Sequence, residues 1–353
     1  MNAVQSKSSG FLAGMFTLAG VLLVVASLVF AWLVFEYRAF TDTPLELPAS
    51  GFTIEIAPGS SLRTVARELR RQGLLEHPRF FAWLGRQTGF ASRIHAGEYR
   101  VEPGTTPLKL LEQLAGGKVI QHSLTLVEGW TFRQVREALA GQPALEHRLE
   151  DLSDAELMSH LGHPDEHPEG RFLPDTYHFP RGTSDSDFLK RAYDAMEDRL
   201  SQEWEGRETG LPLKDPYEAL ILASIIEKET ARPAERAEIA GVFIRRLQRN
   251  MRLQTDPTVI YGMGSAYDGN IRARDLRTDT PYNTYTRAGL PPTPIAMPGS
   301  ASVHAALHPA PGDALYFVAR GDGSHEFSSS LEAHNKAVRD YQLIPNSRSS
   351  KSR

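Results

Sequence analysis

The chain has 353 residues, of which 41% are hydrophobic and 23% are charged, and its formal net charge is −4. This length is sufficient for a membrane anchor and two or three modest domains, each with its own core. The mild negative charge argues against nucleic acid as a partner, because nucleic-acid binding normally requires a clustered basic face. The chain has no cysteine, which excludes disulfides, thiol nucleophiles and thiolate metal sites.

The N-terminal part contains an apolar run from 11 to 35 without a charged side chain. Because about 20 such residues cross the hydrocarbon core of a bilayer, we predict a single-pass transmembrane helix over 11–35. Its bulky end, Trp32–Phe35, offers no small-residue cleavage site, so the helix is expected to remain as an anchor. Lys7 precedes the run and mostly acidic residues follow it, which favours a cytoplasmic segment over 1–10 and an extracytoplasmic remainder. The next segment contains Thr, Asp and Pro without periodicity, which predicts a linker over 36–50.

A strand, a turn and a capped helix follow one another twice between residues 51 and 120. The alternating strand Phe52–Ile56 precedes a Pro-Gly turn, two serines that predict a helix N-cap, and a helix with its apolar residues on one face. The same order recurs from Gly97 to Gly117, and a weaker third copy runs from Ser123 to Ala140. The first two copies resemble a LysM-like module, a glycan-binding fold. We therefore predict a LysM-like αβ module over 51–120, with a purely structural role as the alternative.

Residues 121–215 predict a connecting αβ region. Its middle part is hydrophilic and rich in His, Asp and Pro. Four histidines in it lack the HExxH spacing of a zinc helix and have no cysteine to support them, so we expect no metal site. These histidines are His160, His163, His167 and His178. An amphipathic helix is predicted over 186–204, with Ser186 as its N-cap. The side chains expected to face inward are Leu189, Ala192, Tyr193, Met196 and Leu200.

The stretch Tyr217–Thr230, YEALILASIIEKET, predicts the central helix of the chain. Apolar residues fill it from 219 to 226 without Gly or Pro, so we predict a helix that is buried on most sides and ends in two glutamates. At about 100° per residue, Glu227 and Glu229 point roughly 200° apart. Glu229 continues the most apolar face, and because desolvation disfavours a charged carboxylate it is the better candidate for a raised pKa and a general acid. The alternative is that both are solvated charges paired with basic neighbours.

After the central helix, residues 233–249 predict an amphipathic helix with its basic residues, Arg245, Arg246 and Arg249, directed outward. Segment 251–264 then predicts a strand that begins at Met251 and resumes through Tyr261. Between these two parts Pro257 is expected to lock a turn at which amide, hydroxyl and carboxylate side chains converge.

Two further segments complete the polar and aromatic C-terminal sequence. Segment 281–300 predicts a loop that stiffens into a Pro-rich arm, a costly structure unless it shapes a groove. Segment 315–327 predicts a hairpin around a Gly-Asp-Gly turn. One acid, many hydroxyl and amide groups and several aromatic rings are typical of a sugar groove. The chain has no GxGxxG or Walker loop to hold phosphate.

Four long motifs carry a resemblance to a known family. They are ASIIEKET, MRLQTDPTVIYGMG, YNTYTRAGLPPTPIAMPGS and YFVARGDGSHEFSSSLEAHN. They resemble the motifs of the YceG-like endolytic murein (peptidoglycan) transglycosylases, which are membrane-anchored bacterial enzymes. The resemblance implies an α+β chain with a single N-terminal transmembrane helix, a LysM-like module, a mixed α/β catalytic domain over 216–345 and no metal or cofactor. The last residues, 346–353, are predicted to be a disordered basic tail.

The resemblance implies non-hydrolytic cleavage of the β-1,4 bond between N-acetylmuramic acid and N-acetylglucosamine, which leaves a 1,6-anhydromuramoyl end and limits strand length. The family's catalytic glutamate corresponds to Glu229, which would protonate the glycosidic oxygen and then accept the proton of the muramoyl C6 hydroxyl. Glu227 and Asp256 are candidates for electrostatic stabilisation. The other predicted groove residues are Gln254, Thr255, Tyr261, Tyr282, Asn283, Tyr285 and Phe327.

The predicted partners are peptidoglycan glycan strands and the membrane, and the resemblance also implies peptidoglycan synthases. The predicted location is the inner membrane, with the catalytic domain in the periplasm. Two alternatives remain open. A muramidase-type hydrolase would release reducing ends and would need a second carboxylate near Glu229. A non-catalytic, membrane-anchored peptidoglycan-binding scaffold would not need Glu229 at all.

Overall fold

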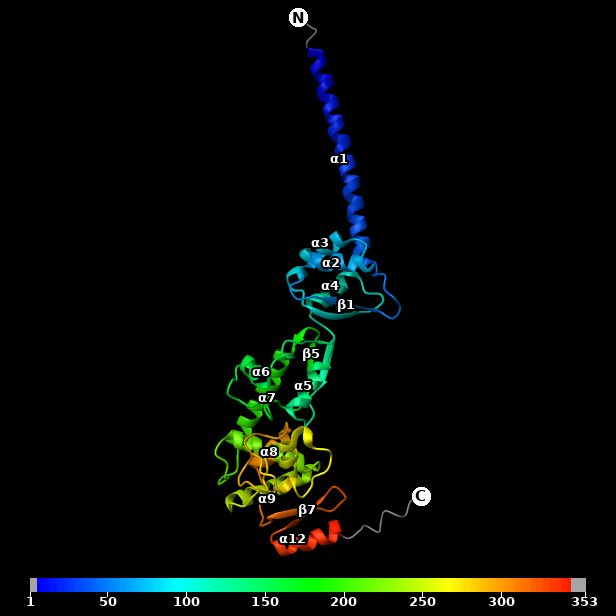
Figure 1. Ribbon diagram of the computed structural model, residues 1–353. Coiled ribbons are helices and arrows are strands. Elements are labelled where there is room, and N and C mark those ends of the chain that lie inside the picture. Colours follow the sequence, from blue (N-terminus) through cyan, green and yellow to red (C-terminus); the bar gives the residue numbers. More distant parts are fainter. Residues whose placement is uncertain (1–4, 344–353) are drawn as a thin grey trace, which may run out of the picture. The chain divides into compact units, whose positions relative to one another are not determined.

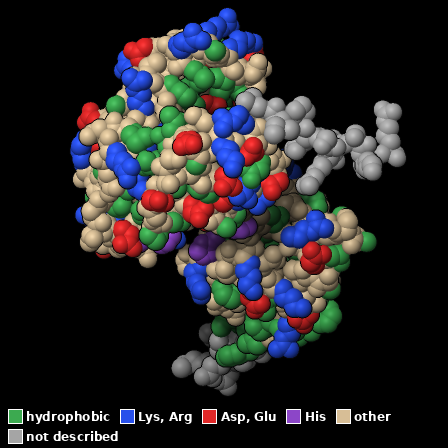
Figure 2. All heavy atoms as spheres, turned by 90° about the horizontal axis from the view of Figure 1, so that it is seen from below, with side chains coloured by type: hydrophobic (Ala, Val, Ile, Leu, Met, Phe, Trp, Pro, Cys, Tyr) green, Lys and Arg blue, Asp and Glu red, His purple; other side chains and the backbone are tan. Residues whose placement is uncertain are grey.

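The computed structural model describes residues 5–343, and the chain divides into two compact units, residues 1–121 and 122–353 (Figure 1). Helices predominate, and the strands of the described residues form four two-stranded sheets. The α+β prediction is therefore confirmed at this level. Lysines and arginines lie among aspartates and glutamates over the face drawn in Figure 2. The predicted tail, 346–353, and residues 1–4 of the predicted cytoplasmic segment lie outside the described residues.

The first unit consists of a long helix followed by a small αβ module. Its elements are α1 (Gln5–Asp42), β1 (Phe52–Ile56), α2 (Leu62–Arg71), α3 (Pro78–Gln87), the 3₁₀ turn η1 (Phe90–Ser92), β2 (Gly97–Val101) and α4 (Pro107–Ala115).

Helix α1 is long and apolar enough to cross a membrane over Met15–Asp42. The helix continues without interruption to Asp42, so the first part of the predicted linker, 36–42, is helical. The reason is tertiary packing, since Tyr37 and Phe40 at its C-terminal end contact aromatic rings of α3 at centroid distances of 4.4 Å to Trp83 and 5.7 Å to Phe80.

The module that follows α1 has the predicted strand, turn and helix order. Strands β1 and β2 pair antiparallel, with Phe52 opposite Val101. Helices α2 and α4 begin at the N-caps Ser61 and Thr106, whose hydroxyls accept backbone N–H groups of the first helical turn. The apolar faces of both helices pack into one core with Tyr99, which is fully buried.

The second unit contains the remaining elements. They are β3 (Gln121–Thr125), α5 (Phe132–Ala140), β4 (Leu145–Glu146), α6 (Asp154–Leu161), β5 (Thr176–Pro180), β6 (Thr183–Ser184), α7 (Asp185–Glu205), α8 (Pro216–Glu229), η2 (Pro233–Glu235), α9 (Arg236–Gln248), α10 (Asp256–Met263), η3 (Gly264–Ala266), η4 (Asp275–Arg277), α11 (Ser300–Leu307), β7 (Tyr316–Ala319), β8 (His325–Ser328), α12 (Leu331–Val338) and the π-helical turn η5 (Arg339–Leu343).

The predicted third strand–helix copy belongs to this second unit. Helix α5 ends at Ala140, where the predicted copy ends, but β3 pairs with β5 and not with the sheet of the first unit. Helix α7 buries the five side chains expected to face inward. Its N-cap is Ser184 and not the predicted Ser186, because the Ser184 hydroxyl accepts the N–H of Asp187 at 3.0 Å.

Helix α8 is the core of the second unit. Asp215 caps it, Pro216 occupies its first turn, and all eight residues from Ala219 to Ile226 are buried, as predicted. Helices α9 and α11 pack against it. Each fully buried Leu or Ile contributes roughly 1.5–3 kcal/mol of transfer free energy, so α8 is a rigid support for the residues at its end.

Two local predictions after α8 are wrong. Residues 256–263 form helix α10 and not a strand, because Pro257 occupies the first helical turn, where a missing N–H has no cost. Arg246 is buried and not directed outward, because its guanidinium donates to backbone carbonyl groups including Leu315 O at 2.7 Å. The Pro-rich arm is packed against α8, where Ile295 N–H donates to the Ser224 hydroxyl at 3.0 Å. The predicted hairpin is confirmed as β7 and β8, which pair antiparallel.

Candidate active site

The C-terminal end of α8 opens into a cavity of about 530 Å³ in the second unit. Glu229, the last residue of the helix, lines this cavity together with α9, the segment before α10, the β7–β8 hairpin and α12. The lining residues with polar or aromatic side chains are Glu229, Arg246, Gln254, Thr255, Asp256, Tyr285, Tyr316, Phe317, His325, His334, Asn335 and Gln342. Segments far apart in the sequence therefore meet at one carboxyl group.

Burial is the main cause of the raised pKa of Glu229, the last residue of α8. Thr230 has extended backbone angles (φ −142°, ψ 135°), so the helix ends at Glu229. Burial raises the pKa of Glu229 to about 7, the Thr255 hydroxyl that donates to its Oε1 lowers the pKa, and the charge of Asp256 raises it. The negative end of the helix dipole also disfavours a carboxylate at this position. The raised pKa predicted for Glu229 is therefore present, and the group can hold a proton near neutral pH.

The segment Gln254–Asp256 forms one wall of the cavity. Gln254 has a positive φ of 49°, which is uncommon for a residue with a side chain. A network of threonine hydroxyls fixes Thr255, since its N–H donates to the Thr284 hydroxyl at 3.1 Å. Asp256 accepts a 2.6 Å hydrogen bond from the Tyr285 hydroxyl. Four predicted groove residues, Gln254, Thr255, Asp256 and Tyr285, thus lie with Glu229 in the cavity wall.

Arg246 was not predicted as a site residue, because the helical pattern of α9 placed it on the solvent face. It lies at the cavity wall, where its guanidinium donates to Leu253 O at 2.9 Å and lies 5.1 Å from the centre of the Tyr316 ring. Burial lowers the pKa of Arg246 from its usual value. Its positive charge lowers the pKa of Glu229, so Arg246 opposes the effect of burial on the acid.

His325 is a second residue that the sequence did not identify. Its Nδ1 lies 2.7 Å from Glu235 Oε2, and its backbone N–H donates to Glu235 Oε1 at 3.1 Å. Partial burial raises the pKa of Glu235, but the hydrogen bonds from His325 outweigh this effect and hold the pKa below its usual value. An ionised Glu235 binds the Nδ1–H of the imidazole, so the ring orientation is fixed and Nε2 is the nitrogen left for other contacts.

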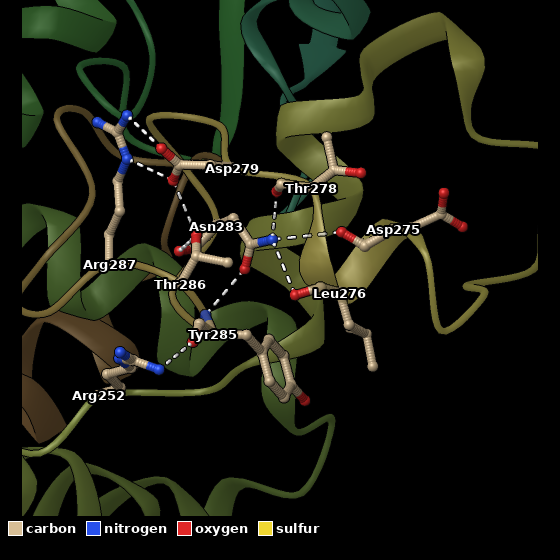
Figure 3. A network of polar contacts seen from close by, with 9 residues as sticks. All are labelled: Arg252, Asp275, Leu276, Thr278, Asp279, Asn283, Tyr285, Thr286 and Arg287. Atoms are coloured by element: carbon tan, nitrogen blue, oxygen red, sulfur yellow. Dashed lines mark hydrogen bonds and ion pairs between the residues drawn. The ribbon is translucent and has the colours of Figure 1, made fainter.

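Asn283 has a structural role and does not line the cavity (Figure 3). Its Nδ2 lies 2.7 Å from Thr278 O and 3.2 Å from each of two other carbonyl oxygens, and its Oδ1 accepts the N–H of Tyr285 at 2.9 Å. Arg252 donates to Tyr285 O at 3.0 Å from the other side. Asn283 therefore holds the loop that presents Tyr285 to the cavity.

The other predicted groove residues lie outside this cavity. The Glu227 carboxylate is buried, accepts the Gly299 N–H at 3.0 Å and lies 3.4 Å from Arg236, so it joins the Pro-rich arm to α8 and α9. The Tyr282 hydroxyl lies 2.9 Å from that of Thr293. Phe327 packs against the main core. The helical period correctly predicted that Glu227 and Glu229 point to different surroundings. It did not predict what each side chain contacts.

Tyr261 contacts a second carboxyl group with a raised pKa in this unit, that of Glu169. Its hydroxyl donates to Glu169 Oε2 at 3.0 Å, while Glu169 Oε1 accepts the Phe132 N–H at 3.0 Å. Burial raises the pKa of Glu169 to about 7, and the two hydrogen bonds lower it. Glu169 does not line the cavity of Glu229. No sequence pattern indicated this residue.

One group of side chains in the described residues has a composition suited to a metal ion. The ligand atoms of Glu203, His304 and His308 lie within 4.8 Å of one another, and none of these residues lines the cavity of Glu229. His304 Nδ1 lies 2.8 Å from Glu203 Oε2, so a carboxylate–imidazole pair accounts for the arrangement without a metal.

Comparisons with known proteins give a consistent result. Residues 54–340 match the YceG-like family. A Bacillus subtilis (strain 168) protein named endolytic murein transglycosylase is 32% identical over 309 residues, which cover 82% of this chain and 84% of the relative. A relative of the same name from Streptococcus pneumoniae (strain D39) is 27% identical, over 90% of this chain and 64% of its own length. The crystal structure of a YceG-like protein from Listeria monocytogenes covers 81% of this chain with 30% identity and a TM-score of 0.50.

Proposed function

Because the chain belongs to the YceG-like family and is an endolytic murein transglycosylase, we propose that Glu229 carries out both proton transfers of its reaction. In the first, the protonated carboxyl donates its proton to the glycosidic oxygen while the bond from that oxygen to C1 of the muramoyl residue breaks. The observation that carries this role is a carboxyl group that opens to a cavity and has a pKa of about 7. A group with this pKa has both protonation states available at neutral pH.

In the second transfer, the Glu229 carboxylate accepts the proton of the muramoyl C6 hydroxyl as its oxygen attacks C1 of the same sugar. The C6 oxygen–C1 bond replaces the broken glycosidic bond, and Glu229 is protonated again for the next cycle. The products are a 1,6-anhydromuramoyl end and a free C4 hydroxyl on N-acetylglucosamine. Because the nucleophile is already attached to the reacting sugar, no second carboxylate is needed to activate water.

The surrounding residues have roles that follow from their contacts. The Thr255 hydroxyl donates to the Glu229 carboxyl and favours its charged form after the first transfer. Asp256 accepts a hydrogen bond from Tyr285, and its negative charge stabilises the positive charge of an oxocarbenium-like state. Gln254 and the aromatic rings of the β7–β8 hairpin supply polar and flat apolar surfaces for the sugars.

The two N-terminal parts complete the proposal. Helix α1 is the single-pass anchor in the inner membrane, with the N-terminus in the cytoplasm and with residues 51–120 and the second unit in the periplasm. Residues 51–120 form a LysM-like module that binds glycan strands, as the repeated strand and capped helix suggest. Partnership with peptidoglycan synthases follows from the family resemblance alone and belongs to the same proposal.

The test is mass spectrometry of muropeptides that the full chain releases from purified glycan strands. The wild type is expected to give 1,6-anhydro ends, and Glu229→Gln is expected to give none while it still binds strands. Reducing ends from the wild type would instead identify a muramidase-type hydrolase, and Asp256→Asn would then test the second carboxylate. Equal release by the wild type and Glu229→Gln would exclude Glu229 as the acid.

A further inference from the structure

The face formed by α2 and α3 in the first unit carries four exposed arginines around an exposed tryptophan. Arg63 and Arg67 lie one helical turn apart on α2, and Arg79 and Arg86 lie on either side of Trp83 on one face of α3. These five residues, with Pro78 and Ala82, line a hollow of about 670 Å³, which we call the arginine groove. Trp83 is 51% exposed in the groove, although it is a large apolar side chain. Neither the proposed reaction nor the module core uses this face.

The charge of the arginine groove is not neutralised by any residue that the structure describes. No carboxylate lines the groove, and none of its four arginines forms an ion pair with another residue that the structure describes. By contrast, Arg71 on the same helix is paired with Glu68 at 2.7 Å. Residues 51–120 contain ten Lys and Arg against six Asp and Glu, a formal charge of +4, whereas the whole chain carries −4. Guanidinium groups bind phosphate through paired N–H donors, so the groove suits a ligand with phosphate groups.

The arginine groove lies beside the end of the predicted membrane span. The Tyr37 ring contacts the Trp83 ring at a centroid distance of 4.4 Å, and the Tyr37 hydroxyl donates to Gln87 Oε1 at 3.0 Å. Tyr37 is the second residue after the apolar run that ends at Phe35. At 1.5 Å per residue, it lies about 3 Å beyond that run, whereas the headgroup layer extends roughly 5–8 Å beyond the hydrocarbon core. Trp83 is therefore at headgroup depth, where tryptophan and tyrosine rings are enriched.

We propose that the arginine groove binds the phosphate groups of anionic phospholipids in the membrane that α1 crosses, with Trp83 in the headgroup layer. This contact fixes the first module against the membrane surface. The proposal goes beyond the reaction at Glu229 and rests on the proposed anchor, α1. An anionic surface strengthens binding by roughly fivefold per nearby arginine.

The test uses the full chain in lipid nanodiscs that contain phosphatidylcholine and a rising fraction of phosphatidylglycerol. The fluorescence of Trp83 is isolated as the difference between the wild type and Trp83→Phe, and its quenching by a headgroup-spin-labelled phospholipid is measured. Quenching by an acyl-chain-labelled lipid, isolated in the same way with Trp32→Phe, reports separately whether α1 is in the membrane. Trp32 lies inside the apolar run, so a failure of the anchor and a failure of the groove are distinguishable.

The double variant Arg67→Gln/Arg86→Gln removes two charges from the arginine groove. Its matched control, Arg93→Gln/Lys109→Gln, removes two exposed charges of the same module that do not line the groove. We expect the apparent affinity of the Trp83 site for phosphatidylglycerol to fall about tenfold or more in the groove variant and less than threefold in the control. If Trp32 is quenched, α1 is in the membrane. An equal fall of the affinity in both variants, or no fall in either, would then contradict the proposal. If inorganic phosphate protects Trp83 from quenching in pure phosphatidylcholine nanodiscs, the groove is a site for free phosphate. That result would also contradict the proposal.

Discussion

Two carboxyl groups of the second unit, those of Glu229 and Glu169, have pKa values raised to about 7 by burial, yet their surroundings differ. Glu229 lies at the end of α8 and opens to the cavity of about 530 Å³. Glu169 is 3% exposed and is closed in by the Phe132 N–H and the Tyr261 hydroxyl. A raised pKa by itself therefore does not distinguish a catalytic carboxyl group from a structural one. Access to a cavity is what distinguishes the proposed catalytic acid.

The largest expected effect is on activity, when each of the two carboxyl groups is replaced separately by an amide. Glu229→Gln cannot donate or accept the reaction's protons, so we expect the rate of anhydro-end formation to fall by about 10³-fold or more. Glu169→Gln keeps the shape of the protonated acid, and we expect its rate to stay within about threefold of the wild type. The measurement is the initial rate on purified glycan strands at pH 7. A large loss of activity in Glu169→Gln with an intact fold would show that Glu169 also takes part in the reaction.

The second expected effect is on the pH dependence of stability. Glu169 has a higher pKa in the folded chain, about 7, than its usual value of 4.5, so the folded state binds more protons between these pH values. The contribution of Glu169 to the free energy of unfolding is complete below pH 4.5 and is lost as the pH rises through 7. The full contribution is roughly 3 kcal/mol. Glu169→Gln removes this dependence.

Urea denaturation of the full chain at pH 5, 6, 7 and 8, followed by tryptophan fluorescence, measures this change. The loss of stability between pH 5 and pH 8 is expected to be about 2–3 kcal/mol smaller in Glu169→Gln than in the wild type. The exposed Glu208→Gln serves as the control and should match the wild type. If Glu169→Gln also has the wild-type pH dependence, Glu169 does not hold a proton in the folded chain.

The smallest of the three effects concerns the Glu235–His325 pair beside Glu229. Glu235→Gln replaces a charge-assisted hydrogen bond to His325 by a neutral one, so the imidazole is less firmly oriented at the cavity wall. We expect kcat/KM to fall about tenfold, since a hydrogen bond to a charged group contributes about 1.5–3 kcal/mol. The pH–rate profile is expected to change as well, because the charge of His325 lowers the pKa of Glu229.

The control for this pair is Glu238→Gln, which changes an exposed glutamate of α9. It should leave both kcat/KM and the pH–rate profile unchanged. If Glu235→Gln lowers stability but leaves the pH–rate profile of the remaining activity unchanged, the pair only supports the hairpin. A shift of the basic limb of the profile in Glu235→Gln alone would show that the pair acts on Glu229.

Features that depend on neighbours along the chain could be predicted from the sequence. The period of α8 separated Glu227 from Glu229 and placed the latter at an apolar helix end. Helix caps, the hairpin of β7 and β8 and the apolar run of α1 also follow from local patterns. Two local patterns were misjudged. The N-cap of α7 is Ser184 and not Ser186, and Pro257 fits the first turn of helix α10 as well as it fits a turn in a strand.

The groups that surround Glu229 could not be predicted in this way, because tertiary packing brings them together. Arg246 has the spacing of a solvent-facing residue on α9, yet it is buried because the chain around Leu315 packs over that face and supplies carbonyl acceptors. His325 and Glu235 are distant in sequence, and so are Thr255 and Glu229. Periodicity reports which face of an element is apolar, but it contains no information on which distant segment covers that face. The proton on Glu229 depends on that cover, because desolvation and nearby charges set its pKa.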